Sequence, residues 1–178
     1  MIKNSPQTRR VFFGNSVLTM ISLGSFAIPG AAAACQPVIT DQQRAKNILV
    51  VRNFFELMHR KEIDAWAELW AENGRIIVPY PPEGFGTSID GKAEILRAFR
   101  GLFGNFESFD YELTGTYPAA DSGAVCVEYK VRATMVGGVE YTNDNIAVFR
   151  FEAGLISAYH DYFDPRRFQT VIDALPKP

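Results

Sequence analysis

The side chains best suited to acid–base chemistry lie near the end of the chain, in the stretch 155–168. Its first half alternates as a β-strand does, so Tyr159 and Asp161 share one face while His160 points to the other. Burial among apolar and aromatic neighbours raises the pKa of a carboxyl group, and a pKa near neutrality suits proton transfer. Asp161 is therefore a candidate acid or base if it faces a pocket. The alternative is a structural Asp161 that accepts backbone hydrogen bonds near the strand end.

Other polar and aromatic residues are candidate ligand contacts. Tyr159, and Tyr80 in the proline-rich loop 79–86, could line the mouth of a pocket and hydrogen-bond a ligand oxygen. Asn143 belongs to an unusual polar run within a predicted strand, where Asp144 is a second candidate carboxylate. We find no metal-site spacing and no nucleotide-binding motif, so we expect chemistry without a cofactor or a metal.

The elements that must position these residues follow a simple order. Helical periodicity and helix-end signals predict three helices, at 41–59, 64–70 and 92–103, with a short strand at 75–78. Four longer strands and a closing helix follow, at 106–117, 124–135, 139–151, 155–163 and 165–175. Asp164 and Pro165 suit the cap and first position of that last helix. Helices followed by strands predict an α+β domain, with three N-terminal helices on one face of a curved antiparallel sheet.

Composition sets further bounds on function. The 178 residues suit one domain of common size, and a hydrophobic content of 47% is enough for a core. The net charge is −2 and the chain has no cluster of Lys and Arg. Nucleic-acid-binding proteins concentrate positive charge, so we do not expect a nucleic-acid partner.

Residues 1–34 are typical of an export signal that is removed from the mature protein. They contain Arg9 and Arg10, no acidic residue, a 12-residue apolar run and four consecutive alanines. The paired arginines favour twin-arginine export, with an ordinary secretory signal as the alternative. We therefore predict a periplasmic or extracytoplasmic protein with a linker at 35–40 and one domain at 41–178. Cys35 would contact a membrane only if it is lipidated.

The order of elements, three helices and then a curved meander, resembles the nuclear transport factor 2-like fold. The closing residues resemble those of SnoaL-like proteins, in particular Asn143, 148–151, 154–156 and 159–165. This resemblance spans about residues 41–175 and implies a cone-shaped fold with a pocket between helices and sheet. It also implies a catalytic carboxylate at Asp161, as in the cyclase, epoxide hydrolase and phenazine branches.

At two places this sequence lacks the catalytic residues of enzyme classes that share the fold. Phe54 stands where ketosteroid isomerases carry an oxyanion-binding tyrosine, so we expect Phe54 to contact the ligand without donating a hydrogen bond. Glu128 and Lys130 reverse the charge order of the Arg and Asp on the middle strand of epoxide hydrolases of this fold. Neither of these two activities is therefore expected.

We expect a small apolar or aromatic ligand, and isomerisation, cyclisation or dehydration by acid–base chemistry. The rival interpretation is a non-catalytic periplasmic module for ligand binding or dimerisation. Fold analogy favours a homodimer through the sheet, and Tyr129, His160 and Tyr162 are the candidates for its exposed face.

Overall fold

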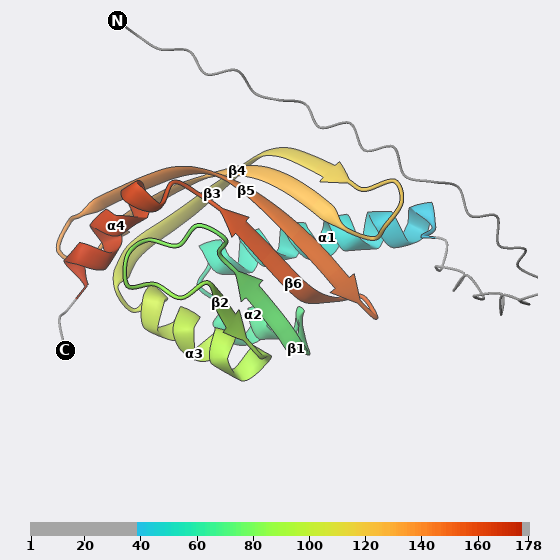
Figure 1. The fold of residues 1–178 in the computed structure, drawn as a ribbon, viewed down its shortest axis with the longest axis horizontal. Helices are drawn as coiled ribbons and strands as arrows, with labels where there is room; N and C mark the ends of the chain where they lie inside the picture. Colours follow the sequence, from blue (N-terminus) through green and yellow to red (C-terminus); the bar gives the residue numbers. More distant parts are fainter. Residues whose placement is uncertain (1–38, 176–178) are drawn as a thin grey trace, which may run out of the picture. The chain divides into compact units, whose positions relative to one another are not determined.

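The structure is a computed structural model that describes residues 39–175. The predicted export signal at 1–34 and Cys35 lie outside the described residues, as does most of the linker at 35–40. Within residues 39–175 the chain forms four helices and a six-stranded sheet (Figure 1). The prediction of an α+β domain with N-terminal helices, a sheet and a short C-terminal helix is confirmed.

The helices begin and end where local chemistry favours it. Helix α1 (Asp41–His59) is capped by Thr40, whose hydroxyl oxygen accepts a 3.1 Å hydrogen bond from the backbone N–H of Gln43. Helix α4 (Pro165–Ala174) starts at the predicted Asp164–Pro165 pair, and the Asp164 carboxylate accepts from the backbone N–H of Arg166 at 2.9 Å. The other two helices are α2 (Ile63–Ala67) and α3 (Lys92–Phe103).

The sheet is mixed, which corrects the expectation of an antiparallel sheet. Its strands lie in the order β2-β1-β6-β5-β4-β3, and β1 pairs with β6 in parallel while every other pair is antiparallel. The chain returns from the β3–β6 meander to place its last strand beside β1, so no hairpin joins these two neighbours. The bounds are β1 (Trp70–Ile77), β2 (Ser88–Asp90), β3 (Phe106–Pro118), β4 (Val125–Met135), β5 (Glu140–Glu152) and β6 (Leu155–Tyr162).

Two elements differ from the predicted ones near the start of the sheet. Strand β1 begins at Trp70, within the predicted second helix, and β2 lies in a segment for which the sequence predicted only a loop and a helix start. Strand β1 is irregular, because its register with β6 shifts between Trp70 and Arg75. Its alternation is therefore interrupted, which hides the strand from a pattern of period two.

The core fills the space between the sheet and helices α1–α3, which lie on the concave side of the sheet (Figure 1). Helix α1 contributes Val51, Phe54, Phe55 and Met58, whose spacing of three and four residues keeps them on one face. No helix within the described range 39–175 has the length and apolar character needed to cross a membrane.

Candidate active site

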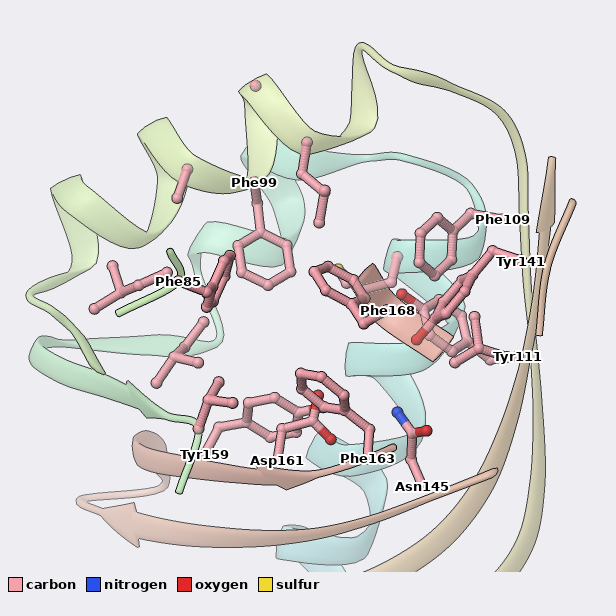
Figure 2. Close-up of a pocket in the computed structure, with 18 of the residues that line it drawn as sticks. Phe85, Phe99, Phe109, Tyr111, Tyr141, Asn145, Tyr159, Asp161, Phe163 and Phe168 are labelled. Carbon is pink, nitrogen blue, oxygen red and sulfur yellow. The ribbon is translucent and has the colours of Figure 1, made fainter. Parts of the chain in front are cut away.

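An apolar cavity of about 270 Å³ lies between the sheet and the helices. Its lining comes from α1, from α3, from β1, β2 and the loop between them, from the inner faces of β3–β6 and from the region of α4. Figure 2 shows Tyr159 and Asp161 projecting into it, with Phe99 and Phe85 opposite and Tyr111 and Tyr141 to one side. For comparison, an apolar cavity of ~150 Å³ is enough to hold benzene.

Asp161 reaches the cavity because of its position on β6. Tyr159 and Asp161 have the same parity and both line the cavity, as the sequence predicted. The facing residue on β5 is Ala147, whose small side chain leaves room beside the carboxyl group. Asp161 therefore stands on a central strand, two residues before the sequence leaves the sheet for α4.

The carboxyl group of Asp161 is held by side chains. The Tyr129 hydroxyl donates a 2.7 Å hydrogen bond to Oδ1 of Asp161. The Tyr129 oxygen also lies 2.8 Å from the Tyr159 hydroxyl oxygen and 2.9 Å from Nδ2 of Asn145, which donates to it. Among residues 39–175 no backbone N–H donates to the Asp161 carboxyl, which is the opposite of what a structural aspartate would show.

Burial sets the protonation of this site. It raises the pKa of Asp161 to about 7, although the hydroxyls of Tyr129 and Tyr159 partly oppose the rise. Of these two, Tyr129 makes the direct hydrogen bond at 2.7 Å. A carboxyl group with this pKa is present in both protonation states near neutral pH. It can therefore accept a proton and return it without a large free-energy penalty in either direction.

Two more phenols line the cavity besides Tyr129 and Tyr159. Burial raises the pKa of Tyr111 well above its ordinary value, and the charge of Asp161 adds to the rise. Burial likewise raises the pKa of Tyr141, whose hydroxyl oxygen accepts a 3.0 Å hydrogen bond from Nδ2 of Asn143. Both groups therefore remain protonated donors at neutral pH.

The predicted contact residues divide into two groups. Phe54 and Tyr159 line the cavity, and their side chains are 1% and 5% exposed. Tyr80 is 68% exposed and does not line the cavity; its ring lies 6.4 Å from that of Tyr162. Asn143 is buried but does not line it either, because its amide binds the backbone of Asp164 and the Tyr141 hydroxyl.

The expected outer face needs one correction. Tyr129 is 3% exposed and faces the cavity, so it is not part of an exposed sheet surface. The sequence contained this signal, because Tyr129 alternates with Val127 and Val131 while the charged residues of β4 take the other face. His160 does point away from Asp161, as predicted, and burial, followed by the charges of Arg150 and Arg75, lowers its pKa.

Four cavity residues were not predicted as part of the site: Tyr111, Tyr129, Tyr141 and Asn145. Asn145 shares the parity of Asn143, so the polar run did point to the correct strand and face. Asp144, the second candidate carboxylate, is exposed on the other side of β5. Within residues 39–175 no group of three or more His, Cys, Asp or Glu side chains could hold a metal ion.

The fold and the cavity together define a class of protein: a nuclear transport factor 2-like domain with a carboxyl group in an apolar pocket. The chain belongs to the family of the SnoaL-like domain, whose family model matches residues 51–159.

Known relatives agree with this assignment. The chain is 31% identical to the uncharacterized protein YesE of Bacillus subtilis over 116 residues, which is 65% of this chain and 79% of that protein. It is 30% identical to the PhzA/B-like protein PA3332 of Pseudomonas aeruginosa over 69% of this chain and 86% of that protein. A crystal structure of a provisionally assigned isomerase from Bacillus subtilis matches with a TM-score of 0.67 and 29% identity, over 75% of this chain and 96% of that one.

Proposed function

We propose that this protein binds a small, neutral apolar or aromatic molecule in the cavity and catalyses cofactor-free proton transfer on it. The reaction class is isomerisation, cyclisation or dehydration, with Asp161 as the group that takes up and returns the proton. The observation that carries this proposal is the position of Asp161, whose pKa burial raises to about 7, inside a cavity that a small molecule can fill.

Proton removal by Asp161 leaves negative charge on the ligand, and the cavity offers groups to stabilise it. Tyr111 and Tyr141 line the same cavity, and both are protonated donors at neutral pH. A phenol that donates to a ligand oxygen stabilises the charge that develops there in the transition state. The proton on Asp161 can then return to another atom of the ligand, which completes an isomerisation, or assist the loss of water.

The charge of the lining restricts the ligand. No Lys, Arg or His is among the residues that line the cavity, whereas Asp161, with a pKa of about 7, carries a negative charge in part of the molecules at neutral pH. A buried anion without a cationic partner is costly, and a second anion beside Asp161 would add repulsion. A neutral ligand avoids both costs, and a volume of about 270 Å³ allows more than a single ring.

The similar proteins also support small-molecule chemistry as the function. One relative of known structure is provisionally assigned as an isomerase, and another relative is PhzA/B-like. Both descriptions are compatible with small-molecule chemistry. The rival, a non-catalytic binding module, differs from the proposal only in what happens after binding.

The test is solvent deuterium exchange, which requires no knowledge of the product. A panel of small neutral ketones with acidic C–H groups is incubated with the domain in D₂O and followed by proton NMR. A ligand that fits should lose carbon-bound protons in the presence of the wild-type protein and keep them with Asp161→Asn. A ligand that binds both proteins and exchanges with neither would identify a binding module and overturn the catalytic proposal.

The proposal also includes location and assembly. The acid-free N-terminus with Arg9 and Arg10 supports export through the twin-arginine route. The outer face of the sheet supports a homodimer, because Ile146 and Tyr162 face each other across β5 and β6 and are 46% and 36% exposed.

A further inference from the structure

Asn145 is an unusual choice for its position. It is 6% exposed on the inner face of β5, and its Oδ1 is buried without a hydrogen-bond partner among residues 39–175. An unpaired buried acceptor destabilises the folded state, whereas an apolar side chain of similar shape would avoid that cost. The presence of asparagine at this position therefore has an explanation other than stability. We look for it in the hydrogen bond that its amide nitrogen donates to Tyr129.

The hydrogen-bond network fixes the direction of each bond around Tyr129. A tyrosine hydroxyl has one proton to donate, and Tyr129 gives it to Oδ1 of Asp161 at 2.7 Å. The contacts at 2.8 Å to Tyr159 and at 2.9 Å to Asn145 must then both be bonds that Tyr129 accepts. This assigns the amide nitrogen of Asn145, and not its oxygen, to the side that faces Tyr129.

The same network distinguishes the two oxygens of Asp161. Oδ1 accepts the 2.7 Å bond from Tyr129. The Tyr159 hydroxyl is near enough to lower the pKa of the carboxyl, but within residues 39–175 no hydrogen bond of ordinary length and angle reaches Oδ2. The carboxyl group projects into the cavity (Figure 2), and we assign Oδ2 as the oxygen available to a ligand. Protonation on Oδ2 leaves the Tyr129 bond to Oδ1 in place, and so no rearrangement of the network is needed during proton transfer.

We infer that Asn145 is a positioning residue: it saturates the Tyr129 oxygen as an acceptor, so that Tyr129 directs its proton to Oδ1 of Asp161 and leaves Oδ2 to exchange protons with the ligand. This inference rests on the proposed acid–base function. It adds a residue that makes no hydrogen bond to the reacting carboxyl and acts on it through Tyr129. Tyr159 has a parallel role, because the assignment above makes its hydroxyl a donor to the same Tyr129 oxygen, 2.8 Å away.

The groups around Asp161 are few, which makes its titration interpretable. Tyr129 on β4, Tyr159 on β6, Tyr111 on β3 and Tyr141 on β5 are the other titratable residues that line the cavity, and burial keeps all four protonated at neutral pH by raising the pKa of each. Farther out, the charges of Arg167 and Asp164 reach Tyr141 and oppose each other there. Where the burial of Asp161 is unchanged, a shift of its midpoint therefore reports a change in its hydrogen bonds.

The test compares Asn145→Leu with Asn143→Leu, a matched change two residues earlier on the same strand and face. The readout is the Asp161 carboxyl pKa in the ligand-free domain, from ¹³C NMR. Without Asn145 the Tyr129 hydroxyl can turn towards Tyr159 and donates less well to Asp161, so the midpoint should rise by about one unit. Asn143→Leu should leave the midpoint unchanged, because Asn143 binds Tyr141 and Asp164 instead.

A double-mutant cycle tests whether Asn145 affects the pKa of Asp161 through Tyr129. Tyr129→Phe should raise the midpoint by at least as much as Asn145→Leu, and adding Asn145→Leu to Tyr129→Phe should cause no further change. Equal midpoints for Asn145→Leu and the wild-type domain would overturn the inference, as would a full additional shift in the double variant. If Asn145→Leu does not fold, the wild-type amide protons provide the test: those of Asn145 should titrate with Asp161 and those of Asn143 should not.

The two proposals fail in different ways. Carboxyl shifts as expected, without proton exchange on any ligand, would refute catalysis and leave the hydrogen-bond assignment standing. Proton exchange that Asp161→Asn abolishes and Asn145→Leu leaves unchanged over the whole pH profile would refute the positioning role alone.

Discussion

The Tyr129 hydroxyl and the Asp161 carboxyl lie on strands that are not neighbours, yet they are joined by a 2.7 Å hydrogen bond across the floor of an apolar cavity. Strand β5 lies between them and presents the small side chain of Ala147 opposite Asp161, on the strand that also carries Asn145. The bond stabilises the charged form of the carboxyl group, whereas burial in the apolar cavity destabilises that form. The balance of these two effects holds the pKa of Asp161 at about 7.

The first prediction concerns the pH dependence of stability. The folded pKa of Asp161, about 7, lies above the ordinary value of 3.8. Its contribution to stability is therefore fully present below the unfolded pKa and is lost as pH rises through the folded pKa. The loss is at most ~4 kcal/mol from three units at ~1.4 kcal/mol each.

Asp161→Asn removes this charge with little change of shape. Its unfolding free energy should match that of the wild-type domain near pH 4 and exceed it at pH 8, as measured by urea denaturation at both values. A variant that is less stable than the wild type at pH 8 would mean that the carboxylate is a structural acceptor.

The second prediction concerns ligand charge. At pH 8, where Asp161 is mostly charged, a neutral probe such as 2-naphthol should raise the melting temperature, whereas 2-naphthoate, of similar size, should not. A ligand present at 100 times its dissociation constant adds ~2.7 kcal/mol, which thermal shift detects easily. Asp161→Asn should reduce the difference in melting temperature between the two probes, because it removes the repulsion between the Asp161 carboxylate and the naphthoate. Preferential binding of 2-naphthoate by the wild-type domain would contradict the expectation that the cavity, which has no cationic lining residue, prefers a neutral ligand.

The order of most elements followed from sequence patterns, and the inward direction of Asp161 from the resemblance to SnoaL-like proteins. The alternation of β6 placed Tyr159 and Asp161 together, and Asp164 with Pro165 predicted the start of α4. A period of two gives the relative direction of side chains within one strand. It does not tell which faces of different strands lie on the same side of the sheet. The hydrogen bond between Tyr129 and Asp161 could therefore not be predicted from the sequence.

Other errors have equally local causes. The parallel pairing of β1 with β6 joins residues about 80 positions apart, and no turn signal marks such a pair. Asn143 and Asn145 have the same parity on one strand, and only the end of the cavity decides that Asn145 lines it while Asn143 binds the start of α4. Tyr80 was assigned to the pocket from its loop alone.

The third prediction concerns assembly. Ile146→Glu introduces a charge into the exposed apolar pair formed with Tyr162 on the outer face of the sheet. If the face is a dimer interface, light scattering should show a dimer for the wild-type domain and a monomer for this variant. The control is Leu49→Glu, which places the same charge on a 57% exposed position of α1 and should leave the dimer intact. A monomeric wild-type domain at high micromolar concentration would refute this interface.

The fourth prediction concerns export. Replacing both Arg9 and Arg10 by Lys keeps the charge and removes the paired guanidinium groups, so a reporter fused to the N-terminal segment should stay in the cytoplasm. Cell fractionation measures this, and mass spectrometry of the mature N-terminus tests whether Cys35 carries lipid. Export that persists in cells without the twin-arginine translocase would contradict this route.

The central claim is that Asp161 is a proton-transfer group poised in the cavity. Its most direct test is a ¹³C NMR titration of the Asp161 carboxyl carbon in the wild-type domain, with the signal assigned by its loss in Asp161→Asn. The account predicts a midpoint near pH 7. A midpoint at or below ~4, the value of an ordinary aspartate, would contradict it.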